Sequence, residues 1–417
     1  MAKDQGTKKL PIPKIIKKNT VLLSITQALF SGVFQSVVVI AALSIFFFTQ
    51  SLALGALASS VVIGGRVLVA YGAGRLMDRI GRKTVIYFGI LIICSALLVM
   101  VSALYTDSIL LLWIGIFMFG TGGGIMNMLR VPVTDMYPAN RRGQGMGYML
   151  TGSIMGTIMP PILSMIAPYF AFTSLNAYEI IMLFSVPLMA MGILFVKLIS
   201  PDTKEILHNL KSYYPEDMPL ASLVDCKLSK ATAKVSLLYT IAAFNASGFS
   251  WGGMVMGMSM VSIMLQQFGV ALTLINLAVS IHVFGMYGFS IPWGWLTDRR
   301  GRRMVIALGG IILGIGAFLM PITRDYLIVT FGVFLVGLGW SATNVASTAL
   351  ICDITPGPKR GSILGANDVV NGLASLTFPS LGGIVLSSLG FFAFGVAGLL
   401  VALPVVLSIV PIREPSR

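Results

Sequence analysis

The fold is decided by the stretch Gly74-Arg-Leu-Met-Asp78-Arg79-Ile-Gly81-Arg82-Lys83, which returns 220 residues later as Gly294-Trp-Leu-Thr-Asp298-Arg299-Arg-Gly301-Arg302-Arg303. A second pair of motifs repeats with an offset of 218 residues: Asp135-x-x-Pro138-x-x-Arg141-Arg142-Gly143 and Asp353-x-x-Pro356-x-x-Lys359-Arg360-Gly361. Two motifs that share nearly one offset indicate an internal repeat. The chain therefore consists of two halves with the same topology.

Composition places both halves in a membrane. Hydrophobic residues make up 56% of the 417 positions and charged residues only 11%, whereas soluble domains carry about 25% charged residues. Each apolar run is long enough for the ~20 residues that cross a bilayer as a helix, and the absence of alternation excludes a membrane β-barrel. We predict an all-α membrane protein of twelve transmembrane helices, at 20–48, 52–74, 84–105, 108–134, 144–171, 176–199, 235–265, 270–295, 304–322, 326–352, 362–388 and 390–411.

The distribution of the net charge of +14 predicts the orientation. With few exceptions, among them Arg66 and Arg324, lysines and arginines lie in the tails or in loops that follow even-numbered runs. This positive-inside bias places both termini in the cytoplasm, and we expect a multi-pass protein of the cell membrane. The first run is too long for a signal-peptide core and is interpreted as a retained span. The charge does not indicate nucleic-acid binding.

The longest polar connection separates the two halves. We assign residues 1–200 to an N-terminal six-helix half with a cytoplasmic tail, 201–234 to a cytoplasmic linker, and 235–417 to a C-terminal six-helix half. A short surface helix is expected in the linker near Thr203–Ser212. The three cysteines lie far apart and form no metal or disulfide pattern.

In these motifs the chain resembles the major facilitator superfamily, over its whole length and with no subfamily assigned. The resemblance implies a central cavity lined mainly by helices one, four, seven and ten, and transport driven by an ion or solute gradient, as symport or antiport. Acidic residues are absent from helices one, four and seven, so features of several known subfamilies are missing. A phosphate-binding loop is also missing, so ATP-driven transport is unsupported.

The repeated motifs supply the expected gate. Gly74 and Gly294 remove a side chain where helices approach closely, and Asp78 and Asp298 can accept charge-assisted hydrogen bonds beside a helix N-terminus. The resemblance implies that these aspartates latch the halves together on the cytoplasmic side. The full set of gating candidates is Gly74, Asp78, Arg79, Gly81, Arg82, Asp135, Arg142, Gly294, Asp298, Arg299, Gly301, Arg302, Asp353 and Arg360. The alternative is that these loops are only stop-transfer charge clusters.

Arg66 and Asp368 lie deep inside the predicted spans, where an ionisable group is costly and indicates a functional or structural role. Arg66 is eight residues before Gly74 and Asp368 is seven residues after Gly361, which places them about 12 Å and 10 Å from the same membrane edge. We predict a breakable pair between them, opened by protonation of Asp368 or by an anionic substrate at Arg66. The alternatives are snorkelling of Arg66 and a structural role for Asp368 beside Asn367 and Asn371.

His282 is a second candidate for proton coupling because imidazole titrates near neutral pH, although a lone histidine on an apolar helix also fits a packing role. Arg130 is a candidate for the gate around Asp135 rather than for the binding site. Trp251, with its aromatic ring, joins the amides as a candidate for the cavity wall. Besides Arg66, the candidate substrate-binding residues are Gln27, Gln35, Asn127, Asn245, Trp340 and Asn344, each of which could instead bond a neighbouring helix.

These observations predict a secondary active transporter of a small organic solute that works by alternating access and is coupled to protons. Two directions stay open: uptake of an organic anion by symport, and proton-linked export of amphipathic compounds. A receptor without flux is the third alternative. We expect a monomer in the lipid bilayer whose partners are a small-molecule substrate and protons, with no cofactor, no metal and no enzymatic activity.

Overall fold

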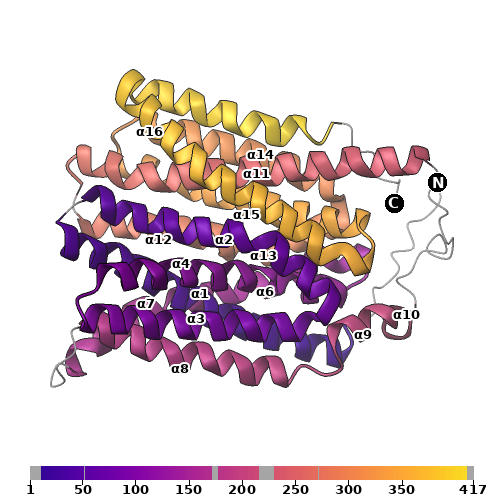
Figure 1. The fold of residues 1–417 in the computed structure, drawn as a ribbon. Coiled ribbons are helices and arrows are strands. Elements are labelled where there is room, and N and C mark those ends of the chain that lie inside the picture. Colours follow the sequence, from indigo (N-terminus) through magenta and orange to yellow (C-terminus); the bar gives the residue numbers. More distant parts are fainter. Residues whose placement is uncertain (1–10, 51, 171–176, 216–229, 271, 411–417) are drawn as a thin grey trace.

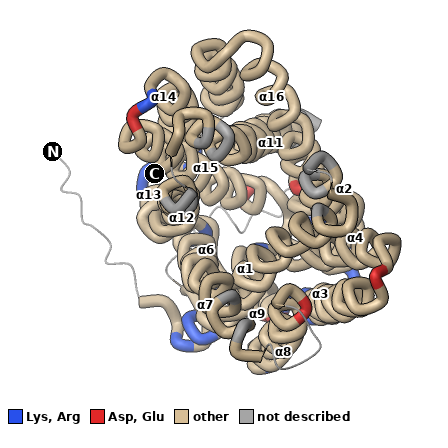
Figure 2. Tube along the Cα trace, turned by 90° about the vertical axis from the view of Figure 1, so that its left-hand side faces the viewer, with Lys and Arg blue, Asp and Glu red and all other residues tan. Residues whose placement is uncertain are grey.

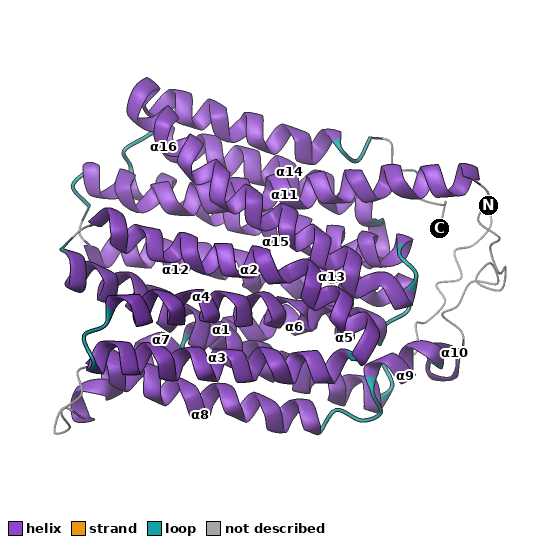
Figure 3. Cartoon of the chain, in the orientation of Figure 1, coloured by secondary structure: helices purple, strands orange, loops and turns teal. Residues whose placement is uncertain are grey.

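A computed structural model describes residues 11–50, 52–170, 177–215, 230–270 and 272–410. The described part of the chain is helical, with short turns between long helices that run side by side (Figures 1 and 3). Apolar residues without alternation form these helices because each must satisfy its own backbone groups within lipid.

The N-terminal half contains eight α-helices and three 3-10 turns in its described part. The α-helices are α1 (Lys14–Thr49), α2 (Leu52–Ile80), α3 (Arg82–Tyr105), α4 (Ile109–Met126), α5 (Arg130–Asp135), α6 (Arg142–Thr157), α7 (Met159–Ile166) and α8 (Ala177–Lys197). The 3-10 turns are η1 (Asn127–Leu129), η2 (Ala139–Arg141) and η3 (Ala167–Phe170). The fourth predicted span is therefore α4, η1 and α5 in succession, and the fifth is divided between α6 and α7.

The C-terminal half has its helix breaks at different places. It consists of α11 (Lys230–Gln267), α12 (Leu272–Gly288), α13 (Ser290–Arg300), α14 (Arg302–Leu319), η5 (Met320–Ile322), α15 (Tyr326–Ile354), η6 (Gly357–Lys359) and α16 (Arg360–Leu407). Within α16 the chain reverses at Gly390, whose φ of +81° favours a residue without a Cβ atom. The two sides of this reversal are the eleventh and twelfth spans.

The prediction of twelve spans in two halves is confirmed. Eight helical stretches among the described residues are long and apolar enough to cross a membrane, and the longest of them, Gly357–Leu407, holds both spans of α16. The remaining three spans are α6 with α7, α11, and α12 with α13. Figure 2, which looks along the helices, shows the two groups next to each other; α2 packs against α16 and α6 packs against α13.

Charged residues gather at one end of the bundle, which we call the charged end and which is formed by the turns at Gly81, η2, Gly301 and η6. Gly81 and Gly301 have φ of +106° and +95°, so both tight turns require glycine. The first described residues of α1 lie at this end, on the right of Figure 1.

The linker covers the charged end with two short helices, α9 (Thr203–His208) and α10 (Leu210–Tyr213), close to where a surface helix was predicted. Lys204 Nζ donates to the backbone oxygen of Asp78, 3.4 Å away, in the N-terminal half. Leu207 lies against Gly357 of the C-terminal half. The α9 helix therefore touches both halves.

Candidate functional site

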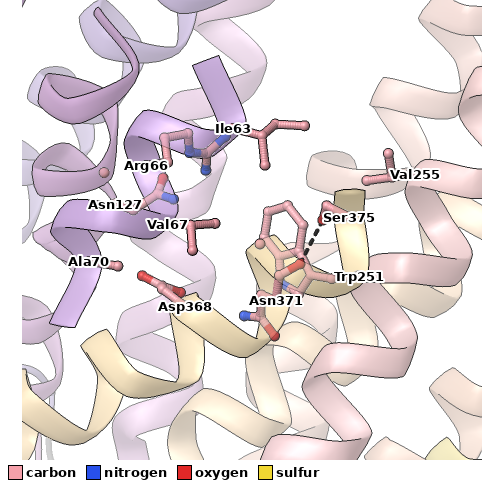
Figure 4. A pocket seen from close by; sticks show the side chains of 12 residues that line it. Ile63, Arg66, Val67, Ala70, Asn127, Trp251, Val255, Asp368, Asn371 and Ser375 are labelled. Atoms are coloured by element: carbon pink, nitrogen blue, oxygen red, sulfur yellow. Dashed lines mark hydrogen bonds between the residues drawn. The ribbon is translucent and has the colours of Figure 1, made fainter. Parts of the chain in front are cut away.

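A cavity lies between the halves, where α2 and the α4–η1 segment face α11 and α16. It encloses about 510 Å³ of empty space, part of which is open to solvent. Its polar residues come from both halves, as Figure 4 shows. We call it the central cavity and define it by Ile63, Arg66, Val67, Ala70, Gly124, Asn127, Trp251, Val255, Asp368, Asn371, Gly372 and Ser375.

Arg66 has no hydrogen-bond or ion-pair partner among the described residues. Its guanidinium carbon lies 5.2 Å from the centre of the Phe34 ring, and that ring stacks on Phe119 at 5.6 Å. A cation over an aromatic face gains about 0.5–2 kcal/mol. This is less than the roughly 2.5–3.5 kcal/mol that it costs to place an arginine at the centre of the bilayer. The arginine therefore lies against an aromatic ring and is still open to an anion.

The ion pair predicted between Arg66 and Asp368 is wrong in this conformation, because Asp368 bonds Arg130 instead. Arg130 Nη2 donates to Asp368 Oδ1 and, at 3.1 Å, to the backbone oxygen of Leu364. Both side chains of the pair are about nine-tenths buried. The prediction compared only the depths of Arg66 and Asp368 in the membrane. Arg130, on α5, lies at a similar depth and forms the ion pair with Asp368. Arg130 thus contacts the cavity wall and not the gate around Asp135.

The C-terminal half presents aromatic rings to the central cavity. Trp251 packs edge-to-face on Trp340 with their centroids 4.9 Å apart, and Tyr287 packs on Trp340 at 5.9 Å. Trp251 lines the cavity, and Trp340 is buried behind it with 1% exposure. Arg66 interacts electrostatically with Tyr287 as well as with Asp368. Such T-shaped contacts hold the tryptophan ring in a fixed orientation.

Two latches join the halves at the charged end. Asp78, at the end of α2, accepts hydrogen bonds from the backbone nitrogens of Gly361 (3.0 Å) and Ser362 (2.7 Å) and from Ser362 Oγ (2.7 Å). These nitrogens are the free donors at the start of α16, where a carboxylate is stabilised by the helix dipole. Asp298, near the end of α13 in the C-terminal half, likewise accepts hydrogen bonds from the start of α6 in the N-terminal half. The donors are Gly143 N at 3.0 Å and Gln144 N at 2.7 Å.

Arginines surround each latch in a matching arrangement. On one side Arg82 Nε and Arg360 Nη1 donate to the two oxygens of Asp135, at 2.9 and 3.0 Å.

On the other side Arg302 Nε donates to Asp353 Oδ2 at 2.8 Å, and Arg142 donates to Asp353 Oδ1. Each aspartate therefore bonds one arginine from its own half and one from the other half. The structure does not bring Arg79 or Arg299 into these networks; Arg299 instead lies over the exposed Trp295 ring at 3.5 Å.

Glycines allow the backbones to meet beside the latches. A Cβ atom on Gly74 would lie 2.6 Å from the carbonyl carbon of Gly361, and one on Gly294 would lie 2.7 Å from that of Gly143. Both distances are shorter than real Cβ contacts, so only glycine fits while the charged end is closed.

The structure places the other predicted polar residues outside the central cavity. Gln27 donates to Ser153 Oγ at 3.0 Å and Gln35 to Ser31 Oγ at 3.1 Å, each within the N-terminal half. His282 is fully buried between α12 and α15, with Nδ1 2.7 Å from the Val333 oxygen. The side chain of Asn344 is buried and that of Asn245 is exposed, and neither lines the cavity.

Asn371, Ser375 and Tyr287 contribute to the site and were not proposed for it from the sequence. Asn371 and Ser375 follow Asp368 at intervals of three and seven residues, so all three lie on one face of α16. That spacing is visible in the sequence and is the signal that could have found them. Tyr287 has no such signal, because its approach to Arg66 depends on how α12 packs.

The sequence profile of the Major Facilitator Superfamily matches residues 20–260 and 236–417. The chain belongs to this superfamily. An uncharacterised transporter of this superfamily from Bacillus subtilis, YdeG, is 26% identical over 78% of this chain and 75% of its own length.

A gentisate transporter from Corynebacterium glutamicum is 26% identical over 85% of this chain and 78% of its own length. The solved structure of the proton:xylose symporter XylE superposes with a TM-score of 0.72 at 15% identity, over 94% of this chain and 95% of XylE. This superfamily protein is therefore a multi-pass membrane transporter.

Proposed function

We propose that this protein is a secondary active transporter that moves small organic anions across the cell membrane by alternating access. The observation that carries the proposal is Arg66, whose guanidinium lines a cavity between the two halves and has no ion-pair partner among the described residues. Its charge cannot be removed by deprotonation. An anion that enters the cavity supplies the missing partner, and this gives binding energy to a negatively charged solute.

The electrostatic balance of the cavity favours an anion over a cation. Asp368 is the carboxylate among the described cavity residues, and Arg130 already neutralises it. Arg66 therefore leaves one net positive charge. The similarity to the gentisate transporter supports the same class of solute, because gentisate is an organic anion.

We infer that the charged end faces the cytoplasm and that the latched conformation is outward-facing. The positive-inside bias of the loops supports this orientation. Two latches and two aspartate–arginine networks seal the cavity toward that side.

The Arg130–Asp368 pair supports the proposal of proton coupling. Arg130 belongs to the N-terminal half and Asp368 to the C-terminal half, so protonation of Asp368 would remove an attraction between them. A ligand shifts a conformational equilibrium only if it interacts differently with the two states, and a proton on Asp368 meets that condition. The expected direction is uptake by symport, with one chain as the working unit.

Flux into proteoliposomes tests the proposal. Benzoate, hexanoate, succinate, glucose and the amphipathic cation tetraphenylphosphonium are offered with an acid exterior, with and without a protonophore. We expect uptake of at least one carboxylate, reduced at least tenfold in Arg66→Gln and partly retained in Arg66→Lys. Glucose uptake alone, or equal anion uptake by Arg66→Gln, would refute the assignment.

Export of amphipathic compounds is the second candidate, favoured by the Trp251–Trp340–Tyr287 rings. Movement of tetraphenylphosphonium against a proton gradient, with no carboxylate flux, would select it.

A further inference from the structure

We propose that the preferred substrates are monocarboxylates that carry an aromatic ring. The inference rests on the proposed function and narrows it from organic anions in general to one charge and one shape. It depends on two features of the central cavity: a cation that no described residue pairs with, and an aromatic wall on the opposite side.

The preference for a substrate with one negative charge follows from how the described ionisable groups of the cavity pair. Arg66 has no ion-pair partner among the described residues, whereas Arg130 and Asp368 form an ion pair with each other. A monocarboxylate at Arg66 makes the cavity neutral. A second carboxylate would stay unpaired in a site where Asp368 already interacts electrostatically with Arg66, and an unpaired buried charge is strongly unfavourable.

The preference for a substrate with an aromatic ring follows from the position of Trp251. Its indole lines the cavity and is held at 90° to Trp340. Phe34 occupies a different position, under the guanidinium of Arg66, so it orients the anion site. A fixed aromatic face across from a cation suits a solute with a carboxylate at one end and a ring at the other.

Such a solute would contact both halves at once. Arg66 belongs to α2 of the N-terminal half and Trp251 to α11 of the C-terminal half, and Figure 4 shows both side chains at the same cavity. A molecule that bridges the halves binds differently when they move apart. Both contacts therefore contribute to transport as well as to affinity.

The test compares benzoate with cyclohexanecarboxylate, which has the same charge and nearly the same size but no aromatic ring. Terephthalate adds a second charge and benzamide removes the charge. Each compound competes with labelled benzoate for uptake by the full-length protein in proteoliposomes. We expect benzoate to compete about three- to tenfold better than cyclohexanecarboxylate, and terephthalate and benzamide to compete least.

Variants of Trp251 test whether its aromatic side chain causes the preference for benzoate over cyclohexanecarboxylate. Trp251→Phe should keep the ratio of benzoate to cyclohexanecarboxylate, and Trp251→Leu should bring it close to one. Trp295→Leu is the matched control, because Trp295 is half exposed at the charged end and outside the cavity. Monodispersity and melting temperature of each variant show that it is folded.

The outcomes separate this inference from the proposed function. Equal competition by cyclohexanecarboxylate, an unchanged ratio in Trp251→Leu, or uptake of hexanoate without benzoate would overturn the inference and leave anion transport standing. No flux of any carboxylate would overturn both.

Discussion

Replacing Asp78 with asparagine should open the charged end of the protein. The Asp78 carboxylate accepts three hydrogen bonds from the start of α16, and its side chain is only 8% exposed. Asparagine keeps one carbonyl oxygen but presents an NH2 group where the other oxygen accepted from Ser362. Two bonds are lost, and the charge that stabilised the helix N-terminus disappears.

The size of the effect follows from these contacts. A hydrogen bond to a charged group contributes about 1.5–3 kcal/mol when buried. Since water can replace part of it once the halves separate, the net loss for two bonds is about 2–4 kcal/mol. That corresponds to a shift of about 30- to 1,000-fold in the equilibrium between the closed and open charged end.

Distance measurements between spin labels can detect such a shift. The three native cysteines are replaced first, and labels are attached at Arg79→Cys and Lys359→Cys, which are exposed at the charged end on opposite halves. In the unmodified background we expect one short distance. In Asp78→Asn we expect a longer distance to become the main population.

Asp107→Asn is the matched control, because Asp107 is an exposed aspartate in the turn at the other end of the bundle. Asp298→Asn should act in the same direction as Asp78→Asn, since Asp298 caps α6 in the same way. An unchanged distance distribution and unchanged uptake in Asp78→Asn would refute the latch.

Three further outcomes are expected. Gly74→Ala should lengthen the same label distance, because its Cβ atom would lie 2.6 Å from a carbonyl carbon on α16, whereas Gly64→Ala, with no atom within 4 Å, should not. Arg130→Gln should lower stability by about 3–5 kcal/mol because a buried carboxylate loses its partner; adding Asp368→Asn should restore the melting temperature but not proton-driven uptake. His282→Leu should leave the pH dependence of uptake unchanged, because this side chain lies outside the cavity, and a shifted profile would assign it a coupling role.

The fold could be predicted from the sequence because lipid leaves few alternatives. A spanning segment needs about 20 apolar residues, and the repeated motif around Asp78 and Asp298 ties the two halves together. What composition could not show is where helices break. The fourth span turns into a 3-10 segment at Asn127–Leu129, and the last two spans continue through Gly390 without a loop.

The site was predicted in part, because residue spacing gives depth and not direction around a helix. Arg66 and Asp368 reach the same cavity, as their matching depths suggested. Arg130 lies at a similar depth and forms the ion pair with Asp368. Which of the two arginines pairs with Asp368 depends on how the helices pack, and residue spacing does not give that. Gln27 and Gln35 point to partners in their own half for the same reason.

The α9 helix connects the linker to both halves at the charged end. Lys204 holds the end of α2 and Leu207 rests on η6, so the halves cannot separate at this end unless one of these contacts breaks. Anything that pulls on the connection between residues 201 and 234, such as a bound protein or a modified side chain, would bias the transport cycle without approaching the solute.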